Sequence, residues 1–161
     1  MIVVVGHGPS ILSGLGAVID SHTVVRLKRG LNNPFCKKRP QHWGTRTDYI
    51  FARSPLWMVE GEKTPYLLYG DEYEDEYLDL NPSYPKPSTG VSAVLCVAKR
   101  LRPERIGLIG FDRVFDHTGR TCRFDRDENH MTLPHDAVAE SKLVFSLGIP
   151  IVDLRTHGTV S

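Results

Sequence analysis

Six short runs rich in β-branched residues are spaced along the chain, and they limit its fold more than any other feature does. They lie at Ile2–Val5, Thr23–Leu27, Asp48–Ala52, Tyr66–Tyr69, Arg105–Ile109 and Ile151–Leu154. Turn residues or helical patterns separate the runs, as is typical of strands buried on both faces of a parallel sheet.

Amphipathic patterns lie between several of these runs and predict helices. They cover Ser10–Ile19, Gly90–Leu101 and Asp136–Leu147. In the last of them, apolar residues at helical spacing are expected to share one face: Val138, Leu143, Val144 and Leu147. Strands that alternate with helices predict an α/β fold, namely a Rossmann-like, doubly wound and mostly parallel sheet with helices on both faces. Such a sheet binds its ligand at the carboxyl ends of the strands, where the strand order reverses.

Length and composition limit the class of protein further. A chain of 161 residues fits one compact domain, which we expect to span residues 1–161. A formal net charge of +1 predicts no particular charged partner. No apolar run approaches the ~20 residues of a membrane span and no signal peptide pattern follows Met1, so a cytoplasmic location is expected.

The three cysteines predict reduced thiols. Cys36, Cys96 and Cys122 lie far apart and form no Cys-x-x-Cys pair. This spacing indicates neither a disulfide framework nor a cysteine zinc site. No cofactor is expected.

Two stretches carry charge of opposite sign. Between Arg26 and Arg53 there are eight basic residues and one acidic residue, whereas residues 71–80 hold six acidic residues and no basic one. Two interpretations stay open: both stretches are solvated surface, or the basic one attracts an anionic substrate while the acidic one is a mobile flap. A nucleic acid partner is not expected, because no recognition motif or aromatic platform accompanies the basic residues.

The first candidate site follows the first predicted strand, where the chain reads Gly6-His7-Gly8-Pro9-Ser10. Glycines permit close backbone approach, and Ser10 is placed to cap the helix that follows. Amides at the start of a helix favour an anion such as a phosphate. The alternative is that the glycines only form a tight turn between strand and helix.

A second candidate lies at residues 87–90, which read Pro-Ser-Thr-Gly before a predicted helix. Ser88 and Thr89 are candidate caps, and this helix start could hold one phosphate together with the first turn. The alternative is capping without a ligand.

His135 marks a third candidate, because it precedes the last predicted helix after a long irregular stretch, residues 110–134. The helix dipole keeps a histidine at a helix N-terminus neutral near neutral pH, which suits it to act as a general base. Glu140 lies five residues later, so a direct bond to a helical His135 does not follow from the spacing. An N-cap position of His135 leaves that bond open, and a surface cap is the alternative to a base.

Taken in chain order, these motifs resemble the sialyltransferases. The resemblance rests on the first turn at residues 6–10, Val25-Arg26, Ser88-Thr89-Gly90-Val91, Ile109-Gly110-Phe111-Asp112, and His135 with Glu140. The bacterial enzymes are most similar in the first turn and the Ser-Thr-Gly helix. The animal enzymes are similar in residues 13–26, which read SGLGAVIDSHTVVR, in Gly44-Thr45-Arg46-Thr47 and in the spacing of the last motif.

The resemblance implies a metal-independent, inverting transferase that moves sialic acid or a similar sugar from a CMP-activated donor to an acceptor hydroxyl, with a glycan as the expected acceptor. It implies that His135 is the catalytic base, accompanied by Glu140 in the catalytic motif. The residues it implies for donor-nucleotide binding are Gly6, His7, Gly8, Pro9, Ser10, Arg26, Lys28, Ser88, Thr89 and Gly90. Candidates for stabilising the leaving phosphate are His117, Arg120 and Arg123. The oligomeric state stays open, with a homo-oligomer as one option.

The sequence departs from the bacterial sialyltransferases at two positions that contact the nucleotide in that family. His7 and Lys28 stand where the family has asparagines. Two other functions therefore stay open: a non-catalytic nucleotide-binding module of the same fold, and an NADP-dependent enzyme in which Arg26 and Lys28 meet a 2′-phosphate. The glycine spacing argues against the second, because Ile11 occupies the position of the third glycine.

Overall fold

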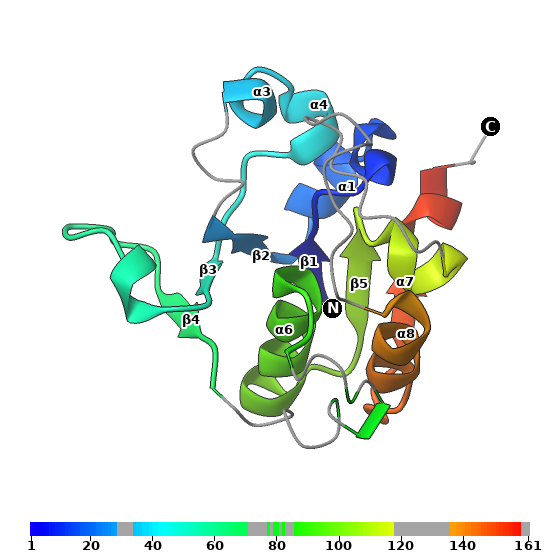
Figure 1. Cartoon of the computed structure of the whole chain (residues 1–161). Helices are drawn as coiled ribbons and strands as arrows, with labels where there is room; N and C mark the ends of the chain where they lie inside the picture. The colour runs from blue at the N-terminus through cyan, green and yellow to red at the C-terminus, as the bar shows by residue number, and fades with distance from the viewer. Residues whose placement is uncertain are drawn as a thin grey trace.

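One six-stranded sheet forms the centre of the molecule in the computed structural model (Figure 1). The structure describes residues 1–28, 34–70, 77, 79–80, 82, 86–117 and 136–158. The strands are β1 (Ile2–Val5), β2 (Thr23–Leu27), β3 (Tyr49–Ala52), β4 (Tyr66–Leu68), β5 (Ile106–Ile109) and β6 (Ile151–Asp153). All six predicted strands are confirmed, and no predicted end differs from the observed one by more than one residue.

The strand order is β4-β3-β2-β1-β5-β6, and every neighbouring pair is parallel. The chain runs outward from β1 to β4 and then returns to place β5 on the other side of β1. The predicted doubly wound α/β fold is therefore confirmed. The strand order reverses between β1 and β5, so the carboxyl ends of these two strands are the expected ligand position.

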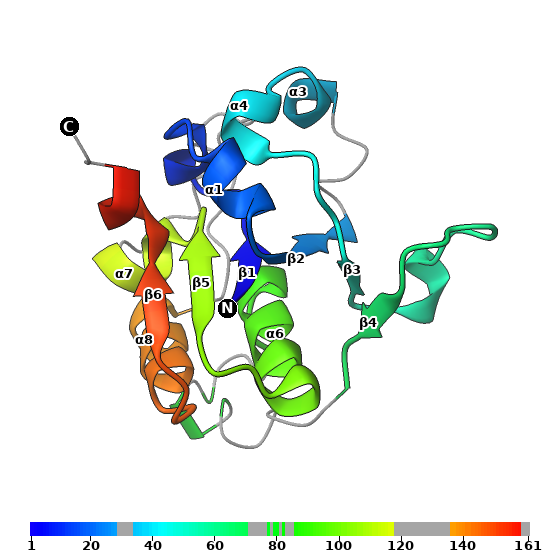
Figure 2. The ribbon, with the colours of Figure 1, turned by 180° about the vertical axis from the view of Figure 1, so that it is seen from behind.

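Helices α6 (Thr89–Cys96) and α8 (Ala137–Phe145) cover one face of the sheet. The core on this face includes Val4 of β1 and Leu108 of β5. Figure 1 shows both helices in front of the strands, and Figure 2 shows β6 in front of α8 from the opposite side. Helix α6 continues into the π-helical turn η3 (Val97–Leu101), so the helix predicted to end at Leu101 is confirmed.

Helices α1 (Gly16–Asp20) and α4 (Pro40–Trp43) cover the opposite face. There the core includes Val3 and Val5, because successive strand residues point to opposite sides of a sheet. The two faces therefore have separate cores that share the same strands.

The predicted helix over Ser10–Ile19 is interrupted. It consists of the 3₁₀ turn η1 (Pro9–Leu12) and the short helix α1, with Gly14 between them at φ +76°. A positive φ is incompatible with a continuous right-handed helix, which explains the break.

The buried face of α8 also differs from the prediction. Leu143 and Val144 are buried as expected, but 44% of Val138 is exposed. The buried stripe instead includes Ala137, Glu140 and the two apolar residues near the end of the helix. A buried glutamate was not foreseen, because charged residues are rarely buried without partners.

Several short elements had no periodicity long enough to predict them. They are α3 (Pro34–Lys37), α4, α7 (Asp112–Asp116), η2 (Pro55–Trp57) and η5 (Leu154–Gly158). Helix α7 corrects the expectation that residues 110–134 are irregular throughout. Residues 118–135 lie outside the described residues.

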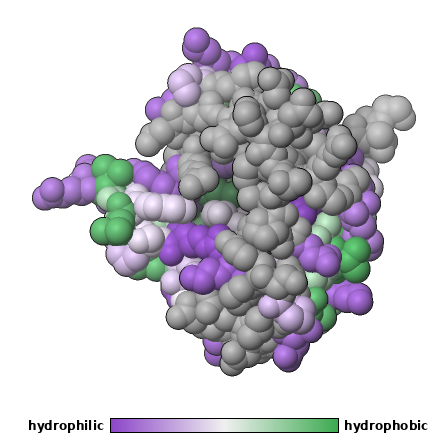
Figure 3. All heavy atoms as spheres, in the orientation of Figure 1, coloured by the Kyte–Doolittle hydropathy of each residue, from purple (hydrophilic) through white to green (hydrophobic). Residues whose placement is uncertain are grey.

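The connection between β3 and β4 projects from the edge of the sheet and carries apolar side chains (Figures 1 and 3). Leu56 is 91% exposed there, and Met58 and Val59 are about half exposed. Most of the acidic stretch that follows lies outside the described residues. Tyr77, within that stretch, is completely buried in the core that α6 covers. The interpretation of the acidic stretch as a mobile flap therefore does not apply at Tyr77.

In the described part of the chain, none of the helices combines the length and the apolar character that a membrane crossing requires. Cys36 and Cys96 are both buried, and Cys122 lies outside the described residues.

The turns that follow β1 and β5 are in direct contact. Gly6 N donates to Ile109 O and Gly8 N donates to Gly110 O, each at 2.8 Å. A Cβ atom at Gly8 would lie 2.1 Å from the Asp112 carboxylate, which only a glycine avoids. The tight-turn interpretation of Gly6 and Gly8 is therefore confirmed as one role of these glycines.

Ser10 joins the same two turns through its side chain. Its Oγ donates to Asp112 Oδ2 at 2.9 Å and accepts from Gly110 N at 3.0 Å. The expectation that Ser10 caps the next helix is wrong, because Gly8 occupies the N-cap position of η1 and no side chain caps it. The hydroxyl is instead committed to the β5 turn.

Arg155, just after β6, extends this contact to a third strand. Its guanidinium lies 3.7 Å from Asp112, and it forms ion pairs of 2.8 Å with Asp116 and Asp153. The hydrogen bond with Asp153, followed by that with Asp116, holds the pKa of Arg155 above its usual range despite partial burial. The carboxyl ends of β1, β5 and β6 are thus linked through Asp112.

We predict that Ser10→Ala lowers the free energy of unfolding by about 1–3 kcal/mol, because it removes the hydroxyl that accepts from the Gly110 amide and one of the donors to the Asp112 carboxylate. Urea unfolding measures this change. Ser13→Ala is the matched control in the same turn: its exposed hydroxyl bonds only to a neighbouring carbonyl, and we expect a change below about 0.5 kcal/mol. Equal effects of the two substitutions would contradict the role of Ser10.

Candidate functional site

Phe111 lies between two segments that the sequence predicted to bind the donor. A Cβ atom at Gly6 would lie 3.0 Å from one edge of the Phe111 ring, and a Cβ atom at Gly90 would lie 3.0 Å from another. Phe111 is only 6% exposed. The first turn and the start of α6, more than 80 residues apart in the chain, therefore meet across one aromatic side chain.

Ser88 is the N-cap of α6, which confirms its predicted capping role. Its Oγ accepts from Val91 N at 3.4 Å, and Thr89 is the first residue of the helix. Ser88, Thr89 and Gly90 are all partly exposed, so they remain accessible from outside the core.

Glu140 connects α8 to this helix start. Its Oε1 accepts from Ser88 N at 2.5 Å, and the residue is 1% exposed. Burial raises the pKa of the Glu140 carboxyl, while the hydrogen bond from Ser88 and the charges of Arg113 and Arg53 oppose that shift. Through this bond the carboxylate holds α8 against the start of α6, and its predicted place in the catalytic motif stays a prediction.

Asp136, and not His135, is the N-cap of α8. Its Oδ1 accepts from Val138 N at 2.8 Å and from Ala139 N at 3.0 Å. The interpretation of His135 as an N-cap is therefore wrong. His135, Arg120 and Arg123 lie outside the described residues, so their predicted roles stay predictions.

His117 is the described member of the group expected at the leaving phosphate. It follows α7 at φ +53°, and its Nε2 lies 2.9 Å from Ser141 Oγ of α8. The His117 ring is therefore held against α8 at Ser141, the residue that follows Glu140 in the chain.

Arg53 is a candidate that the sequence showed only as part of the basic stretch. Its Nη2 donates to Pro87 O at 2.8 Å, directly before Ser88, and its guanidinium lies 5.5 Å from the Tyr69 ring centroid. Its position after β3, at the carboxyl end of a strand, is the signal that could have identified it.

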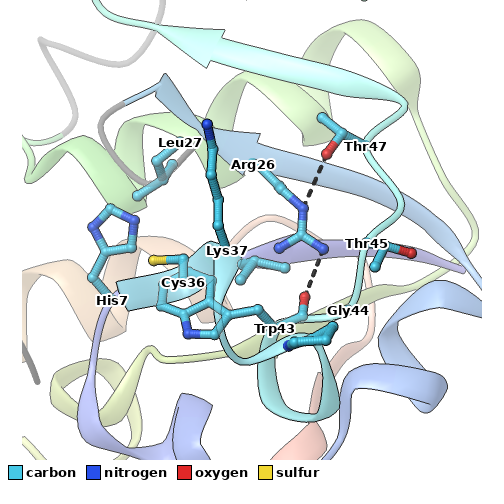
Figure 4. Close-up of a pocket in the computed structure, with 11 residues that line it drawn as sticks. His7, Arg26, Leu27, Cys36, Lys37, Trp43, Gly44, Thr45 and Thr47 are labelled. Atoms are coloured by element: carbon cyan, nitrogen blue, oxygen red, sulfur yellow. Dashed lines mark hydrogen bonds between the residues drawn. The ribbon is translucent and has the colours of Figure 1, made fainter. Parts of the chain in front are cut away.

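Arg26 and His7 both line a pocket at the carboxyl ends of β1 and β2 (Figure 4). Arg26 is 7% exposed; its Nε donates to Arg46 O at 2.8 Å and to Thr47 Oγ1 at 3.1 Å, and its Nη2 donates to Trp43 O at 2.6 Å. The His7 and Trp43 ring centroids are 5.7 Å apart. The pocket therefore borders the first turn through His7, whereas the Ser88–Gly90 segment begins a helix on the other face of the sheet.

Lys28 contacts neither the first turn nor the Ser88–Gly90 segment in the contacts that the structure shows for the described residues. Its ammonium is 5.9 Å from the ring centroid of Tyr66, at the start of β4. Arg46, another basic residue of the 26–53 stretch, forms an ion pair with Asp48 at 2.7 Å. The basic residues of this stretch therefore make separate local contacts.

Among residues 1–28, 34–70, 86–117 and 136–158 and the few others described, no three His, Cys, Asp or Glu side chains are grouped so that they could hold a metal ion.

Two solved structures with a similar fold are both of a mammalian sialyltransferase. One of them is in complex with Gal-β-1-3GalNAc-ortho-nitrophenol. Each has a TM-score of 0.57 and 18% identity to this chain, and the match covers 94% of this chain and 68% of the sialyltransferase. No family model and no curated protein matches the sequence.

The fold of this chain is therefore a doubly wound α/β fold. More narrowly, it is a sialyltransferase-like fold, as the resemblance in the sequence implied.

We predict that Glu140→Gln removes a pH-dependent penalty on stability. Because burial raises the folded-state pKa of this carboxyl, its contribution to stability is fully present below the unfolded-state pKa and is lost as the pH rises through the folded-state value. Glutamine keeps an oxygen for the Ser88 amide without a charge. Urea unfolding, measured over a range that starts below the unfolded-state pKa of the carboxyl and extends to neutral pH, should show the variant gaining stability relative to the unmodified protein as the pH rises.

Glu140→Ala is the control for the hydrogen bond itself. It removes the acceptor at every pH, so it should destabilise at both ends of that range. An unchanged difference between Glu140→Gln and the unmodified protein across the range would contradict a raised pKa.

Proposed function

We propose that this chain is a glycosyltransferase that moves sialic acid or a similar sugar acid from a CMP-activated donor to a hydroxyl of a sugar acceptor. The observation that carries the proposal is the meeting of Gly6 and Gly90 across Phe111, at the point where the strand order reverses. The sialyltransferase-like fold supports it, and so does the sugar compound bound in one of the two similar structures.

The donor nucleotide lies, in this proposal, along the carboxyl edge of β1 between the first turn and the start of α6. Backbone at Gly6 and Gly8 approaches it closely because no side chain intervenes, and the partly exposed Thr89 hydroxyl contacts the phosphate. Arg53, which bonds to Pro87 O, adds positive charge beside the start of α6. Protein groups then stabilise the leaving phosphate without a metal.

His135 accepts the proton of the acceptor hydroxyl in this proposal. Inversion requires the attacking hydroxyl and the departing nucleotide to lie on opposite sides of the sugar carbon, so one base on the acceptor side is sufficient. Glu140 does not exchange a proton with substrate; it holds α8 against the donor segment through the Ser88 amide.

The second candidate function is a nucleotide-binding module without transferase activity. It is favoured by His7, which replaces a nucleotide-contacting asparagine of the bacterial enzymes and packs beside Trp43. Such a module would bind a nucleotide at the same edge and release it unchanged.

We predict that His135→Ala abolishes transfer and slow donor hydrolysis, with a loss of at least about 100-fold in turnover, because general base catalysis contributes factors of this size. Calorimetric titration with CMP should show unchanged affinity. Weakened CMP binding with unchanged turnover of bound donor would reject the base assignment.

Thr89→Val tests the donor segment separately. We expect it to weaken CMP binding about tenfold or more through the lost hydroxyl contact to a charged phosphate, whereas Thr64→Val, remote in the β3–β4 connection, should not. Titration of both variants with CMP, CMP-sialic acid and a UDP-sugar also distinguishes the two functions. Tight CMP-sugar binding without hydrolysis or transfer would favour the module.

A further inference from the structure

The outer side of β4 is one edge of the sheet, because β4 is the terminal strand in the strand order. On its inner side, Pro65 O and Tyr69 N bond to β3 at 3.0 Å each. Alternate residues of a strand point their backbone groups to the same neighbouring strand. Leu67 therefore also faces β3, whereas the backbone groups of Tyr66 and Leu68 point outward.

These outward groups have no strand partner within the described residues. The Leu68 carbonyl accepts a weak bond from Cys96 Sγ at 3.7 Å, and neither the Leu68 amide nor the Tyr66 backbone bonds to another described residue on this side. In Figures 1 and 2, only the β3–β4 connection extends beyond this edge in the described part of the chain. An unpaired edge is a template for another strand.

The opposite edge of the sheet is protected by charge. Asp153, in β6, forms an ion pair of 2.8 Å with Arg155, which also pairs with Asp116. Charged side chains at an edge disfavour pairing with a further strand. The residues of β4 are Tyr-Leu-Leu, without a charge. Pairing with another chain is therefore expected at β4 and not at β6.

The β3–β4 connection places apolar side chains beside this edge, where Figure 3 shows the projecting part in green. Leu56 is almost fully exposed, and Met58 and Val59 are about half exposed. Val59 N donates to Tyr66 Oη at 3.2 Å, which attaches this part of the connection to β4. An exposed apolar surface next to an unpaired edge indicates an interface with another protein chain.

The charges of the connection favour a second copy of this chain over a lipid surface. Glu60, Glu62 and Lys63 are exposed and follow the apolar residues directly. The hydrogen bond from Thr64 N, at 3.0 Å, lowers the pKa of Glu62, so this carboxylate is ionised at neutral pH. Two glutamates are repelled by an anionic membrane surface. Two copies related by a two-fold axis, in contrast, can pair Lys63 of each with a glutamate of the other.

We propose that two copies of this chain pair through β4 as antiparallel strands and bury the exposed apolar residues of both β3–β4 connections. A two-fold axis then places Tyr66 of one copy opposite Leu68 of the other, so that their outward amides and carbonyls bond across the interface. The two sheets become one continuous sheet. The proposal does not depend on transferase activity, because β2 and β3 separate β4 from the ligand edge at β1 and β5.

Sedimentation velocity at a series of protein concentrations tests the dimer. We expect the unmodified protein to sediment as a dimer that dissociates on dilution. Leu56→Glu should raise the dissociation constant at least about tenfold, because a charge replaces apolar surface that the dimer buries. Val138→Glu is the matched control, since Val138 is an exposed apolar residue on α8, remote from β4, and its replacement should leave the constant unchanged. A monomer at every concentration, or equal weakening by both variants, would overturn the proposal.

Leu68→Pro tests the strand pairing itself, because it removes an outward amide and keeps the hydrogen bonds between β3 and β4. We expect it to abolish the dimer while the far-UV circular dichroism of the folded chain is retained. Ile151→Pro is the matched control at the opposite edge: Pro150 O accepts from Ile106 N, so the amide of Ile151 points away from β5. A dimer that persists in Leu68→Pro, or that Ile151→Pro abolishes equally, would contradict pairing through β4. Leu56→Glu decides the question if Leu68→Pro does not fold, because its side chain is exposed.

Vesicles of phosphatidylcholine distinguish a lipid surface from a second copy. We expect the protein not to sediment with them. A monomeric protein that sediments with the vesicles, and that loses this property through Leu56→Glu, would assign the apolar projection to a lipid surface and reject the dimer.

Discussion

The contact between the turns after β1 and β5 is the constraint on which the rest of the structure depends. Backbone amides of Gly6 and Gly8 donate into the β5 turn, and the Ser10 hydroxyl bridges Gly110 and the Asp112 carboxylate. Side chains at the two glycines would collide with that turn. Because the strand order reverses at this contact, the same packing that closes the sheet also shapes its ligand edge.

Two further contacts transmit this arrangement to the helices. Phe111, directly after the β5 turn, separates Gly6 from Gly90 and so sets the distance between the first turn and α6. Glu140 then binds the Ser88 amide and sets α8 against α6. The buried carboxylate is costly, and the hydrogen bond and nearby guanidinium charges offset part of that cost. The segments proposed for donor and base are therefore held by core contacts and not by loops alone.

The basic residues show what a sequence pattern can predict and what it cannot. Charge counting identified the 26–53 stretch, but it could not distinguish Arg26, which is buried and bonded to backbone oxygens, from Lys37, which is exposed at a pocket. Nor could it show that Arg53 bonds the backbone before Ser88. These differences depend on which strand end and which neighbouring loop each side chain meets, and that information is not local in the sequence.

The sequence by itself determined the six strands, the helices that begin near Ser88 and Asp136, and the doubly wound class of the fold. Periodicity and capping are local properties, so they can be recognised without the rest of the chain. Only the tertiary structure decided that Ser10 bonds to Asp112, that Glu140 is buried against Ser88, and that His7 and Arg26 line one pocket. Each of these depends on close packing between segments distant in the chain, where a carboxylate or hydroxyl takes whichever partner burial leaves within reach.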